Sequence, residues 1–214
     1  MSRLGIWVWP QCGQRSDFFS SGIFGLRGKA QQGLCLAGGC RIPGNVPAAD
    51  EDATVVTPAL RIRAARAEDA AWILPMSSRL HDFGPPPFRP RDQMDRAVAA
   101  DIAAGLESPD PDIAVLVAED EATGRPAGFA HIKTLADYFT DEPHGHVSDL
   151  VVAGGAEGRG VGSALLAAAE DWSRARGHRL LTLNVFDENH RARRLYDRVG
   201  YRPDTLRMVK VLAP

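Results

Sequence analysis

The spacing of apolar and polar residues predicts regular structure from Leu60 onward. Residues 60–64 alternate between apolar and polar positions, as a strand with one buried face does. Residues 91–106 instead place an apolar residue at every fourth position, which predicts a helix with one apolar face. A helix is also expected over residues 68–82, because carboxylates stand in its first turn, although Pro75 should kink or break it.

Three further strands are expected in the middle of the chain. Residues 112–120 and 127–135 are rich in apolar residues and flank the turn signal EATGRP, which predicts a hairpin. A loop with acidic and aromatic residues separates this hairpin from a third strand at residues 146–152. These strands are expected to belong to one sheet.

Helices and strands alternate in the last third of the chain. One helix should begin at Val161 and end near Gly177, because glycine is common just past a helix C-terminus. A strand at residues 180–186, a helix capped by Asn189 and a strand at residues 206–212 should follow. The order β-α-α-β-β-β-α-β-α-β predicts an α/β fold with a mixed central sheet and helices on both faces.

The N-terminal quarter of the chain lacks this periodicity. Glycine and serine are frequent there, charges are few, and its final stretch CRIPGNVPAADEDA is typical of a linker. We therefore expect a poorly ordered extension over residues 1–56 and one folded domain over residues 57–214. Cys12, Cys35 and Cys40 all lie in the extension with no histidine among them, so incidental thiols are favoured over a zinc site and no metal is expected.

Composition and charge narrow the range of functions. Of the 214 residues, 44% are hydrophobic, as in ordinary globular proteins, and the formal net charge of -2 argues against a nucleic-acid or membrane-surface partner. No apolar run approaches the ~20 residues that a membrane span needs. The start MSRLGIWVWP lacks the long apolar region of a signal peptide, so a cytoplasmic location is expected.

The stretch EGRGVGSALL gives the first indication of chemistry. Its glycines, Gly158, Gly160 and Gly162, stand at a helix start, where free backbone N–H groups and the helix dipole favour an anion. They either let a phosphate approach the backbone or only permit a tight turn packed on the sheet, and the glycines alone leave both interpretations open. The dinucleotide fingerprint G-x-G-x-x-G does not fit, because Ser163 or Leu165 occupies its third glycine position.

Two blocks resemble the GNAT superfamily of N-acetyltransferases. VVAGGAEGRGVGSALLAAAEDWSRARG is similar to the family's acetyl-CoA-binding motif, R/Q-x-x-G-x-G/A after a strand. NHRARRLYDRVGY is similar to its pattern N-x-x-A-x-x-L-Y-x-x-x-G-F/Y, and the two blocks follow in the family's order. The resemblance covers residues 60–212. Glu157 departs from the motif, which has a basic or amide residue there, and Arg159 could supply the positive charge instead.

The resemblance implies a GNAT-like acyl-CoA N-acyltransferase fold and an enzyme that moves acetyl from acetyl-CoA directly to a primary amine. Strand residues would offer backbone groups to the pantetheine arm and the thioester, and the glycine-rich loop would hold the pyrophosphate. The residues that the resemblance assigns to the cofactor are Leu150, Val151, Val152, Gly158, Arg159, Gly160, Val161, Gly162, Ser163 and Asn189. Asn189 could equally serve as a helix cap alone, or do both.

The resemblance also implies a proton donor and a proton acceptor. Tyr196 matches the tyrosine of the second block and would protonate the departing thiolate, although its apolar stripe also fits a core aromatic residue. Related acetyltransferases often carry a glutamate where this chain has Ser148, which could order a water that takes the amine proton. His146 and Asp149 are alternative bases, and neither is favoured.

The sequence leaves the acceptor open. The loops at residues 81–90 and 137–144 should contribute to its recognition, and the acidic and aromatic residues of the second loop suit either a cationic amine or a solvated surface. The expected partner is a small-molecule or peptide amine, and a homodimer is allowed. The rival function is a non-catalytic CoA-binding sensor or partner module with the same fold.

Overall fold

The computed structural model describes residues 59–108 and 110–212. The extension expected over residues 1–56, with its cysteines, lies outside the described residues. Within the described ranges, no helix is both long and apolar enough to cross a membrane.

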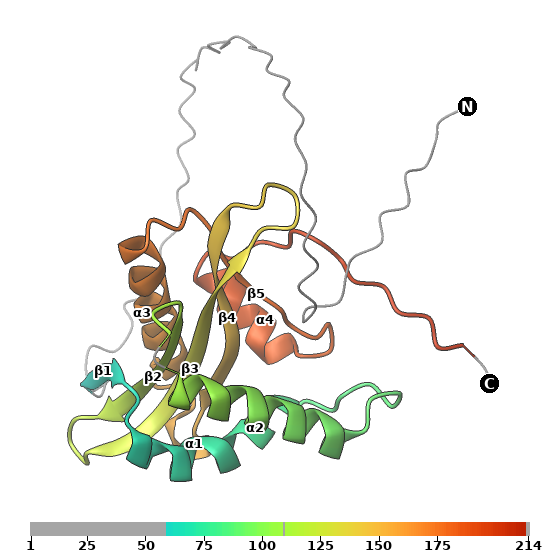
Figure 1. The fold of residues 1–214 in the computed structure, drawn as a ribbon. Coiled ribbons are helices and arrows are strands. Elements are labelled where there is room, and N and C mark those ends of the chain that lie inside the picture. The colour runs from blue at the N-terminus through green and yellow to red at the C-terminus, as the bar shows by residue number, and fades with distance from the viewer. Residues whose placement is uncertain (1–58, 109, 213–214) are drawn as a thin grey trace, which may run out of the picture. The chain divides into compact units, whose positions relative to one another are not determined.

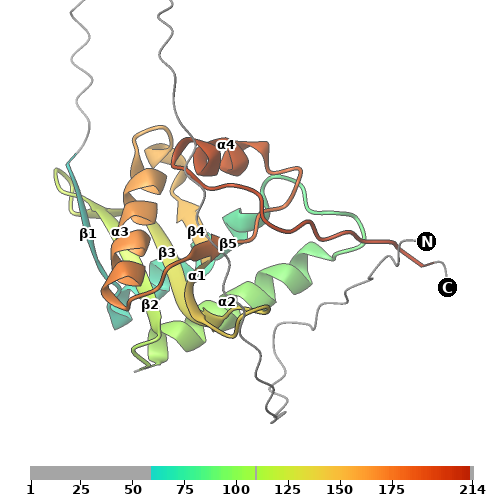
Figure 2. The same cartoon turned by 90° about the horizontal axis from the view of Figure 1, so that it is seen from above.

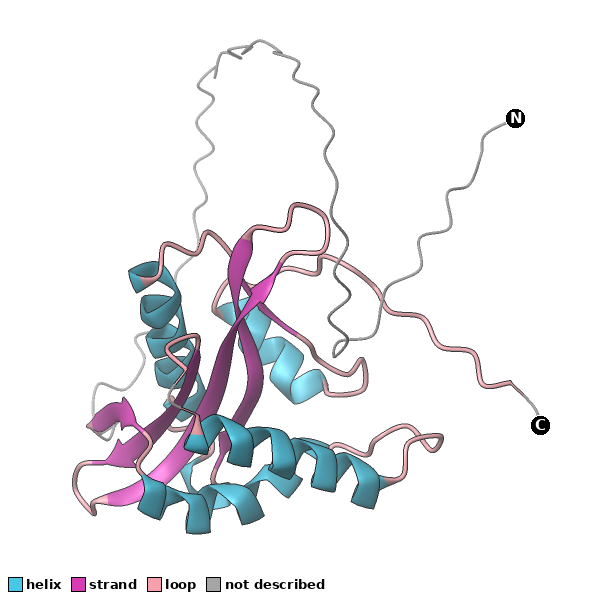
Figure 3. Cartoon of the chain, in the orientation of Figure 1, coloured by secondary structure: helices cyan, strands magenta, loops and turns pink. Residues whose placement is uncertain are grey.

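Five strands form one mixed sheet (Figures 1 and 3). They are β1 Leu60–Ala64, β2 Ile113–Asp120, β3 Arg125–Ala136, β4 Pro143–Val152 and β5 Leu181–Leu183. The strands follow chain order across the sheet, and every neighbouring pair is antiparallel except β4 and β5, which are parallel. A parallel pair needs a long crossover, and the glycine-rich loop and its helix provide it.

Helices cover both faces of this sheet. They are α1 Ala70–Met76, α2 Arg91–Glu107, α3 Val161–Ala175 and α4 His190–Arg198, with 3-10 turns η1 Ala67–Asp69, η2 Ser77–His81 and η3 Gly154–Ala156. Figure 2 shows α3 on one side of the sheet and α2 on the other. The expected α/β fold, a mixed sheet with helices on both faces, is confirmed.

Each face of the sheet has its own apolar core. Phe129 of β3 and Ile102 of α2 are fully buried on one face, where Trp72 of α1 meets the Phe129 ring edge-on at a centroid distance of 6.3 Å. Ile132 of β3 and Leu165 of α3 are fully buried on the other. Because burying such a side chain contributes about 1.5–3 kcal/mol, the two cores fix β3, and β4 beside it, between the helices.

The expected helix over residues 68–82 forms as three consecutive pieces, η1, α1 and η2. Pro75 lies one residue before the end of α1, and the chain then continues in the tighter turn of η2. Proline has no N–H for the bond to the fourth preceding residue, so the α-helix ends where its bonding pattern is already incomplete.

The expected strand at residues 206–212 is wrong for this structure. Residues 202–212 are exposed, and they have no regular secondary structure. A strand forms only where a neighbour accepts its backbone hydrogen bonds, and none of the five described strands pairs with this segment. The strand expected at residues 180–186 is also shorter, since only the three residues of β5 pair with β4.

Candidate functional site

The strands β4 and β5 separate halfway along β4. Only residues 145–147 of β4 pair with β5, whereas residues 149–152 remain paired with β3 on their other side. One edge of β4 is therefore open over its C-terminal half. Ser148 lies at the point of separation, in a bulge where the register with β3 skips one residue. Bulges bend a strand and interrupt its pairing, which accounts for the divergence.

The three strand residues expected to hold the cofactor arm lie on this open edge. The side chains of Leu150 and Val152 pack toward the α3 core, and that of Val151 packs toward the core under α1 and α2. What they can offer a ligand along this unpaired edge is therefore backbone N–H and C=O groups. Ser148 lies on the same strand, and the contact of these residues with a cofactor stays a prediction.

The loop after β4 presents further backbone donors. Gly158 and Gly160 have φ angles of +77° and +81°, a left-handed conformation that suits glycine, and open space lies where their Cβ atoms would be. In α3 the first internal bond runs from the Ala164 N–H to the Gly160 carbonyl, so the N–H groups of residues 161–163 have no helical partner. Together with the positive end of the helix dipole, they suit a phosphate.

Gly162 has a different role from the other two glycines. A Cβ atom at this position would lie 2.9 Å from Leu195 Cδ2 of α4 and 3.7 Å from Val152 Cγ2. Real Cβ atoms do not approach another carbon that closely, so glycine here lets α3 and α4 come together. Of the two interpretations that the sequence left open, close packing is observed at Gly162, and a contact of its backbone with a phosphate stays a prediction.

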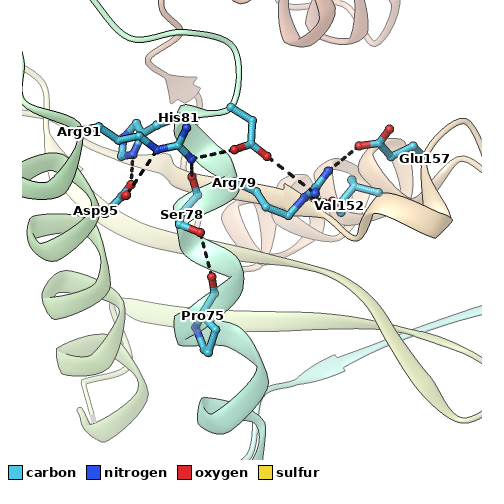
Figure 4. A network of polar contacts seen from close by, with 9 residues as sticks. Pro75, Ser78, Arg79, His81, Arg91, Asp95, Val152 and Glu157 are labelled. Atoms are coloured by element: carbon cyan, nitrogen blue, oxygen red, sulfur yellow. Dashed lines mark hydrogen bonds and ion pairs between the residues drawn. The ribbon is translucent and has the colours of Figure 1, made fainter.

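Glu157, which directly precedes Gly158 in the glycine-rich loop, lies between two arginines. Its carboxylate accepts hydrogen bonds from Arg79 of η2 at 2.8 Å and from Arg191 of α4 at 2.7 Å. The Arg191 hydrogen bond, reinforced by Arg79, lowers the pKa of Glu157, which stays ionised at neutral pH. The Arg79 Nε also donates to the Val152 carbonyl at 3.3 Å (Figure 4). The carboxylate that departs from the motif is thus neutralised by two neighbouring cations.

Arg79 belongs to a longer chain of polar contacts, drawn in Figure 4. Its guanidinium lies 3.7 Å from Asp82, which also accepts from Arg91 of α2 at 2.8 Å. Asp95 lies further along α2, where it bonds the buried ring of His81 at 2.6 Å. The network ties the segment before α2 to the glycine-rich loop at residues 153–160, here called the cradle. Sequence reasoning had assigned no role to Arg79.

Arg159, which could supply positive charge to a pyrophosphate, is paired with a carboxylate in this structure. Its guanidinium donates to the Asp120 carboxylate at 2.7 Å, at the end of β2. Asp120 also accepts hydrogen bonds from the N–H groups of Ala122 and Thr123. These three hydrogen bonds lower the pKa of the Asp120 carboxyl, and the one from Arg159 has the largest effect. Arg159 belongs to the glycine-rich loop, but its charge is already paired with Asp120 in this structure.

Asn189 caps α4. Its Oδ1 accepts a hydrogen bond from the Ala192 N–H at 3.1 Å, as the sequence predicted for a cap residue. Its additional contact with a cofactor stays a prediction. The cap fixes the first turn of α4, from which Arg191 reaches Glu157.

Tyr196 lies on the inner face of α4, against the α3 core. Its ring centroid is 5.8 Å from that of Tyr201. Burial raises the pKa of Tyr196 to about 12, so its phenol is protonated throughout the neutral range. The buried hydroxyl of Tyr201 has no hydrogen-bond partner among the described residues. The structure therefore places two tyrosines close together, of which sequence reasoning named one as a catalytic candidate.

His146 and Asp149, the alternative bases, both have partners. His146 Nδ1 lies 2.8 Å from Thr182 Oγ1 of β5, and burial lowers the pKa of His146 to about 4. Asp149 Oδ2 lies 3.0 Å from Nδ1 of the fully buried His131, on the sheet face under α2. His146 is therefore too weak a base, and the Asp149 carboxylate is engaged by His131 on the other face of the sheet.

A possible ligand set for a metal occurs in the same polar cluster. Asp101, His131 and Asp149 bring ligand atoms within 4.8 Å of one another. However, the Lys133 ammonium donates to both Asp101 oxygens, at 2.6 and 2.8 Å, and already neutralises that carboxylate. The expectation that the protein uses no metal stays a prediction.

The loops expected to recognise the acceptor occupy different places. Phe83, in the loop before α2, packs against Phe186, which follows β5, with ring centroids 5.0 Å apart. This contact joins the two segments that flank the open edge of β4. In the other loop, the Asp137 carboxylate accepts from the N–H groups of Phe139 and Thr140, so it stabilises its own turn. A shallow hollow beside it is lined partly by Glu142.

Comparison with known proteins agrees with this geometry. The model of the acetyltransferase (GNAT) family matches residues 77–201, more than half of the chain. A curated relative, the uncharacterized N-acetyltransferase YhfO of Bacillus subtilis (strain 168), is 31% identical over 146 residues, which cover 68% of this chain and 92% of the relative.

Solved structures with the same fold include a putative acetyl transferase from Pyrococcus furiosus, with 23% identity and a TM-score of 0.60 over 72% of this chain and 100% of that chain. Aminoglycoside N-acetyltransferase AAC(6')-Iy in complex with CoA has 21% identity and a TM-score of 0.56, over 73% of this chain and 95% of that chain. At these identities the structures bear on the fold alone. On the family model and the YhfO relative together, the chain belongs to the acetyltransferase (GNAT) family.

Proposed function

We propose that this protein transfers the acetyl group of acetyl-CoA directly to a primary amine of a small molecule or peptide. The observation that carries the proposal is the open edge of β4, which leads to the free N–H groups at the start of α3. An extended chain ending in phosphates fits such a site, because a strand edge binds along its length and a helix N-terminus binds the anion. AAC(6')-Iy, of the same fold, was solved with CoA and with a bisubstrate analogue of CoA.

In this proposal the pantetheine arm lies along residues 150–152, whose backbone groups bond it and polarise the thioester carbonyl. The pyrophosphate lies over Gly158 and Gly160, against the N–H groups of residues 161–163. Glycine at the first two positions leaves open space on the approach. Arg79, Arg191 and Arg159 would supply positive charge on exchanging their present carboxylate partners for phosphate oxygens; this supports cofactor binding despite Glu157.

The reaction is a direct acyl transfer. The amine nitrogen attacks the thioester carbon, the C–N bond forms, and the C–S bond breaks with its electron pair left on sulfur. Tyr196 gives its phenolic proton to that thiolate, and its raised pKa keeps the proton available at neutral pH. The ammonium form of the acceptor first loses a proton to a water ordered by Ser148, and the nitrogen loses its second proton to the same water, which passes both to solvent, as the tetrahedral adduct collapses to the amide. The tyrosinate takes a proton from solvent after CoA leaves.

A water is favoured over a side chain as the proton acceptor. His146 is neutral at pH 7, but with a pKa of about 4 it is too weak to hold the amine proton. Asp149 is turned to the opposite face of the sheet and bonded to His131. Ser148 lies in the bulge without an opposite residue on β3, so its hydroxyl and the open strand edge leave room for a positioned water.

In this proposal residues 57–214 form the catalytic unit, and the protein acts in the cytoplasm. Carboxylates of the loop at residues 137–144 would attract a cationic acceptor. Glu142 is freer to do so than Asp137, whose oxygen stabilises its own loop.

A test of the domain boundary is a chain that starts at Thr57. It should keep the thermal midpoint and the CoA affinity of the full chain, and a drop of several degrees in the midpoint would contradict the boundary.

The function is tested by calorimetry with CoA followed by thiol release from acetyl-CoA with a panel of amines, including polyamines, amino sugars and peptides. CoA binding together with amine-dependent thiol release is expected. Absence of CoA binding would contradict the proposal as a whole. Binding without turnover across the panel would favour the non-catalytic CoA-binding module, and a search for amines that protect the protein thermally would then extend the panel.

A further inference from the structure

A buried polar pair joins β3 to the half of β4 whose other edge is open. Asp149 of β4 is 7% exposed, and its Oδ2 lies 3.0 Å from Nδ1 of His131 on β3, whose side chain is fully buried. A carboxylate can only accept a hydrogen bond, so Nδ1 donates it. The three residues that follow Asp149 are Leu-Val-Val, so this carboxylate is the last polar side chain of the strand.

The pair lies directly beside the bulge at Ser148. In the register with β3, His131 is opposite Asp149, and the next β3 residue is already opposite Val147. Ser148 between them has no opposite residue. The bulge also exchanges the two faces of β4, because Val147 packs in the α3 core while Asp149, two residues on, bonds His131 on the α2 side. In a regular strand both side chains would share one face.

Among residues 149–152, only Asp149 distinguishes the two faces of the sheet. Leu150 and Val152 pack in the α3 core and Val151 packs in the core under α1 and α2, so apolar residues serve on both faces. A shift of one residue moves every side chain of a strand to the other face. Without the bulge the Asp149 carboxylate would enter the apolar α3 core, where an unpaired charge is costly.

His131 is itself held from the side of α2. A Cβ atom at Gly105 would lie 2.6 Å from His131 Nε2, so a side chain there would displace the ring. Asp101, one turn earlier on α2, lies 3.8 Å from Nδ1 and is bonded by the Lys133 ammonium at 2.6 Å. Nε2 is buried without a hydrogen-bond partner among the described residues. The ring is therefore enclosed between α2 and the sheet, and its one short hydrogen bond is to Asp149.

We propose that His131 and Asp149 are positioning residues for the acetyl transfer. Their contact sets the bulge at Ser148 and so decides which backbone groups of residues 150–152 face the open edge of β4. Neither side chain takes part in the chemistry. The catalytic effect rests on the proposed function, whereas the effect on the strand does not.

The direction of the backbone at the open edge depends on this register. The Ala153 N–H donates to Ala127 beside β4, whereas the Val152 carbonyl accepts from Arg79 of η2. Neighbouring residues of a strand direct their backbone groups to opposite edges, so a strand without the bulge would turn the groups of residues 150–152 round. The groups proposed to bond the pantetheine arm and the thioester would then point at β3.

The effect on the strand is tested by amide hydrogen exchange of residues 148–152, measured by mass spectrometry. Asp149→Leu removes the acceptor and leaves a strand end that fits either face, so these residues should exchange at least about tenfold faster than in the parent. Asp149→Asn keeps an oxygen that accepts from Nδ1, and its exchange should stay within about threefold of the parent. Parent-like exchange in a folded Asp149→Leu overturns the proposal.

The effect on the site is tested in the same variants. Asp149→Leu should lower kcat and the affinity for CoA by at least about tenfold each, whereas ADP, which reaches only the cradle, should bind as it does to the parent. Asp149→Asn should keep kcat within about threefold. An Asp149→Asn protein as slow as Asp149→Leu would make the carboxylate a proton acceptor and would overturn the positioning role.

The matched control is Asp69→Leu. It removes another buried carboxylate, which bonds Arg63 of β1 at 2.6 Å, and should leave kcat and the exchange of residues 148–152 at parent values. If Asp149→Leu does not fold, His131→Leu/Asp149→Leu takes its place, because it leaves no unpaired polar group behind. A control that behaves like Asp149→Leu overturns the proposal. A parent that binds no CoA contradicts the proposed function and the catalytic role with it, and hydrogen exchange then decides whether the pair sets the bulge.

Discussion

Arg79 and Glu157 form an ion pair at 2.8 Å although 78 residues separate them in the sequence. The pair connects η2, on the α2 side of the sheet, to the loop that leads into α3. Since Arg191 holds the other oxygen of Glu157 at 2.7 Å, a single carboxylate keeps two cations beside the cradle. Because the same two arginines are proposed to bind the pyrophosphate, Glu157 and the cofactor should compete for them.

The first prediction concerns this competition. Glu157→Gln removes the negative charge and frees both arginines, so the affinity for CoA should rise by about three- to tenfold, or ~1 kcal/mol. The gain should shrink at high salt, because the freed charges act through partly solvated space. Calorimetric titration with CoA at low and high salt measures both effects.

The control for Glu157→Gln is Glu188→Gln, which makes the same change in net charge at a side chain that is 73% exposed. Its CoA affinity should match the parent's. A lower affinity in Glu157→Gln than in both other proteins would mean that the carboxylate orients the arginines for the cofactor rather than competing with it.

The second prediction concerns the close approach of α3 and α4. Gly162→Ala introduces a methyl group 2.9 Å from Leu195 Cδ2, and the resulting overpacking should lower the free energy of unfolding by about 1–3 kcal/mol. Leu195→Ala in the same chain removes the opposing atoms, so the two changes together should cost clearly less than the sum of the two singly. Urea unfolding of the four proteins gives the coupling energy, and simple additivity would show that the two residues do not meet.

Much of the fold could be predicted because its signals are local. The alternation at residues 60–64, the four-residue spacing of α2 and the glycines that end α3 and α4 each depend on neighbours in the sequence. Gly177 and Gly200 do adopt positive φ angles, of +76° and +99°, just past their helices. Residues 206–212 show the limit, because alternation describes one strand and does not say whether another strand lies beside it.

The site could be predicted only where the backbone makes it. Gly158, Gly160 and the start of α3 lie in one continuous stretch, so their spacing indicated an anion site. The partners of the charged residues come from far along the chain: Arg79 meets Glu157, and Asp120 takes the side chain of Arg159. Such pairs depend on how the elements pack. The one signal in the sequence was Glu157, an acid at a position where the motif has a basic or amide residue, which indicated that a cation had to lie nearby.

The third prediction concerns acid stability. His146 has a pKa of about 4 in the folded chain against 6.5 when solvated, so the unfolded state binds more protons between these values. The free energy of unfolding should therefore fall as the pH drops from about 6.5 to about 4, by at most ~3 kcal/mol at 1.36 kcal/mol per pKa unit. Below that range His146 is protonated in both states and contributes no further change.

His146→Gln removes this titration and should flatten the pH dependence of unfolding in that window, whereas His190→Gln, at a 65% exposed side chain, should leave it as in the parent. His178, whose pKa burial also lowers, remains in all three proteins and cancels from the comparison. Urea unfolding at several pH values provides the curves, and equal slopes for the parent and His146→Gln would exclude His146 as the cause.

The last prediction concerns the proton donor, and the neighbouring tyrosine supplies its control. Tyr196→Phe removes one hydroxyl and little volume, so kcat should fall at least about tenfold, toward the low end of what general acid catalysis contributes. CoA affinity should hardly change, because the ring still packs on α3. Tyr201→Phe removes a buried hydroxyl that has no hydrogen-bond partner within the described residues. Its ring centroid is 5.8 Å from that of Tyr196, and kcat should stay near the parent value. With a pKa of about 12, Tyr196 should not produce a high-pH decline in rate below about pH 11, since the phenol is still largely protonated there. Steady-state kinetics with one confirmed acceptor compares the three proteins, and a kcat for Tyr196→Phe within about twofold of the parent, with chemistry rate-limiting, would leave Tyr196 as a core aromatic residue only.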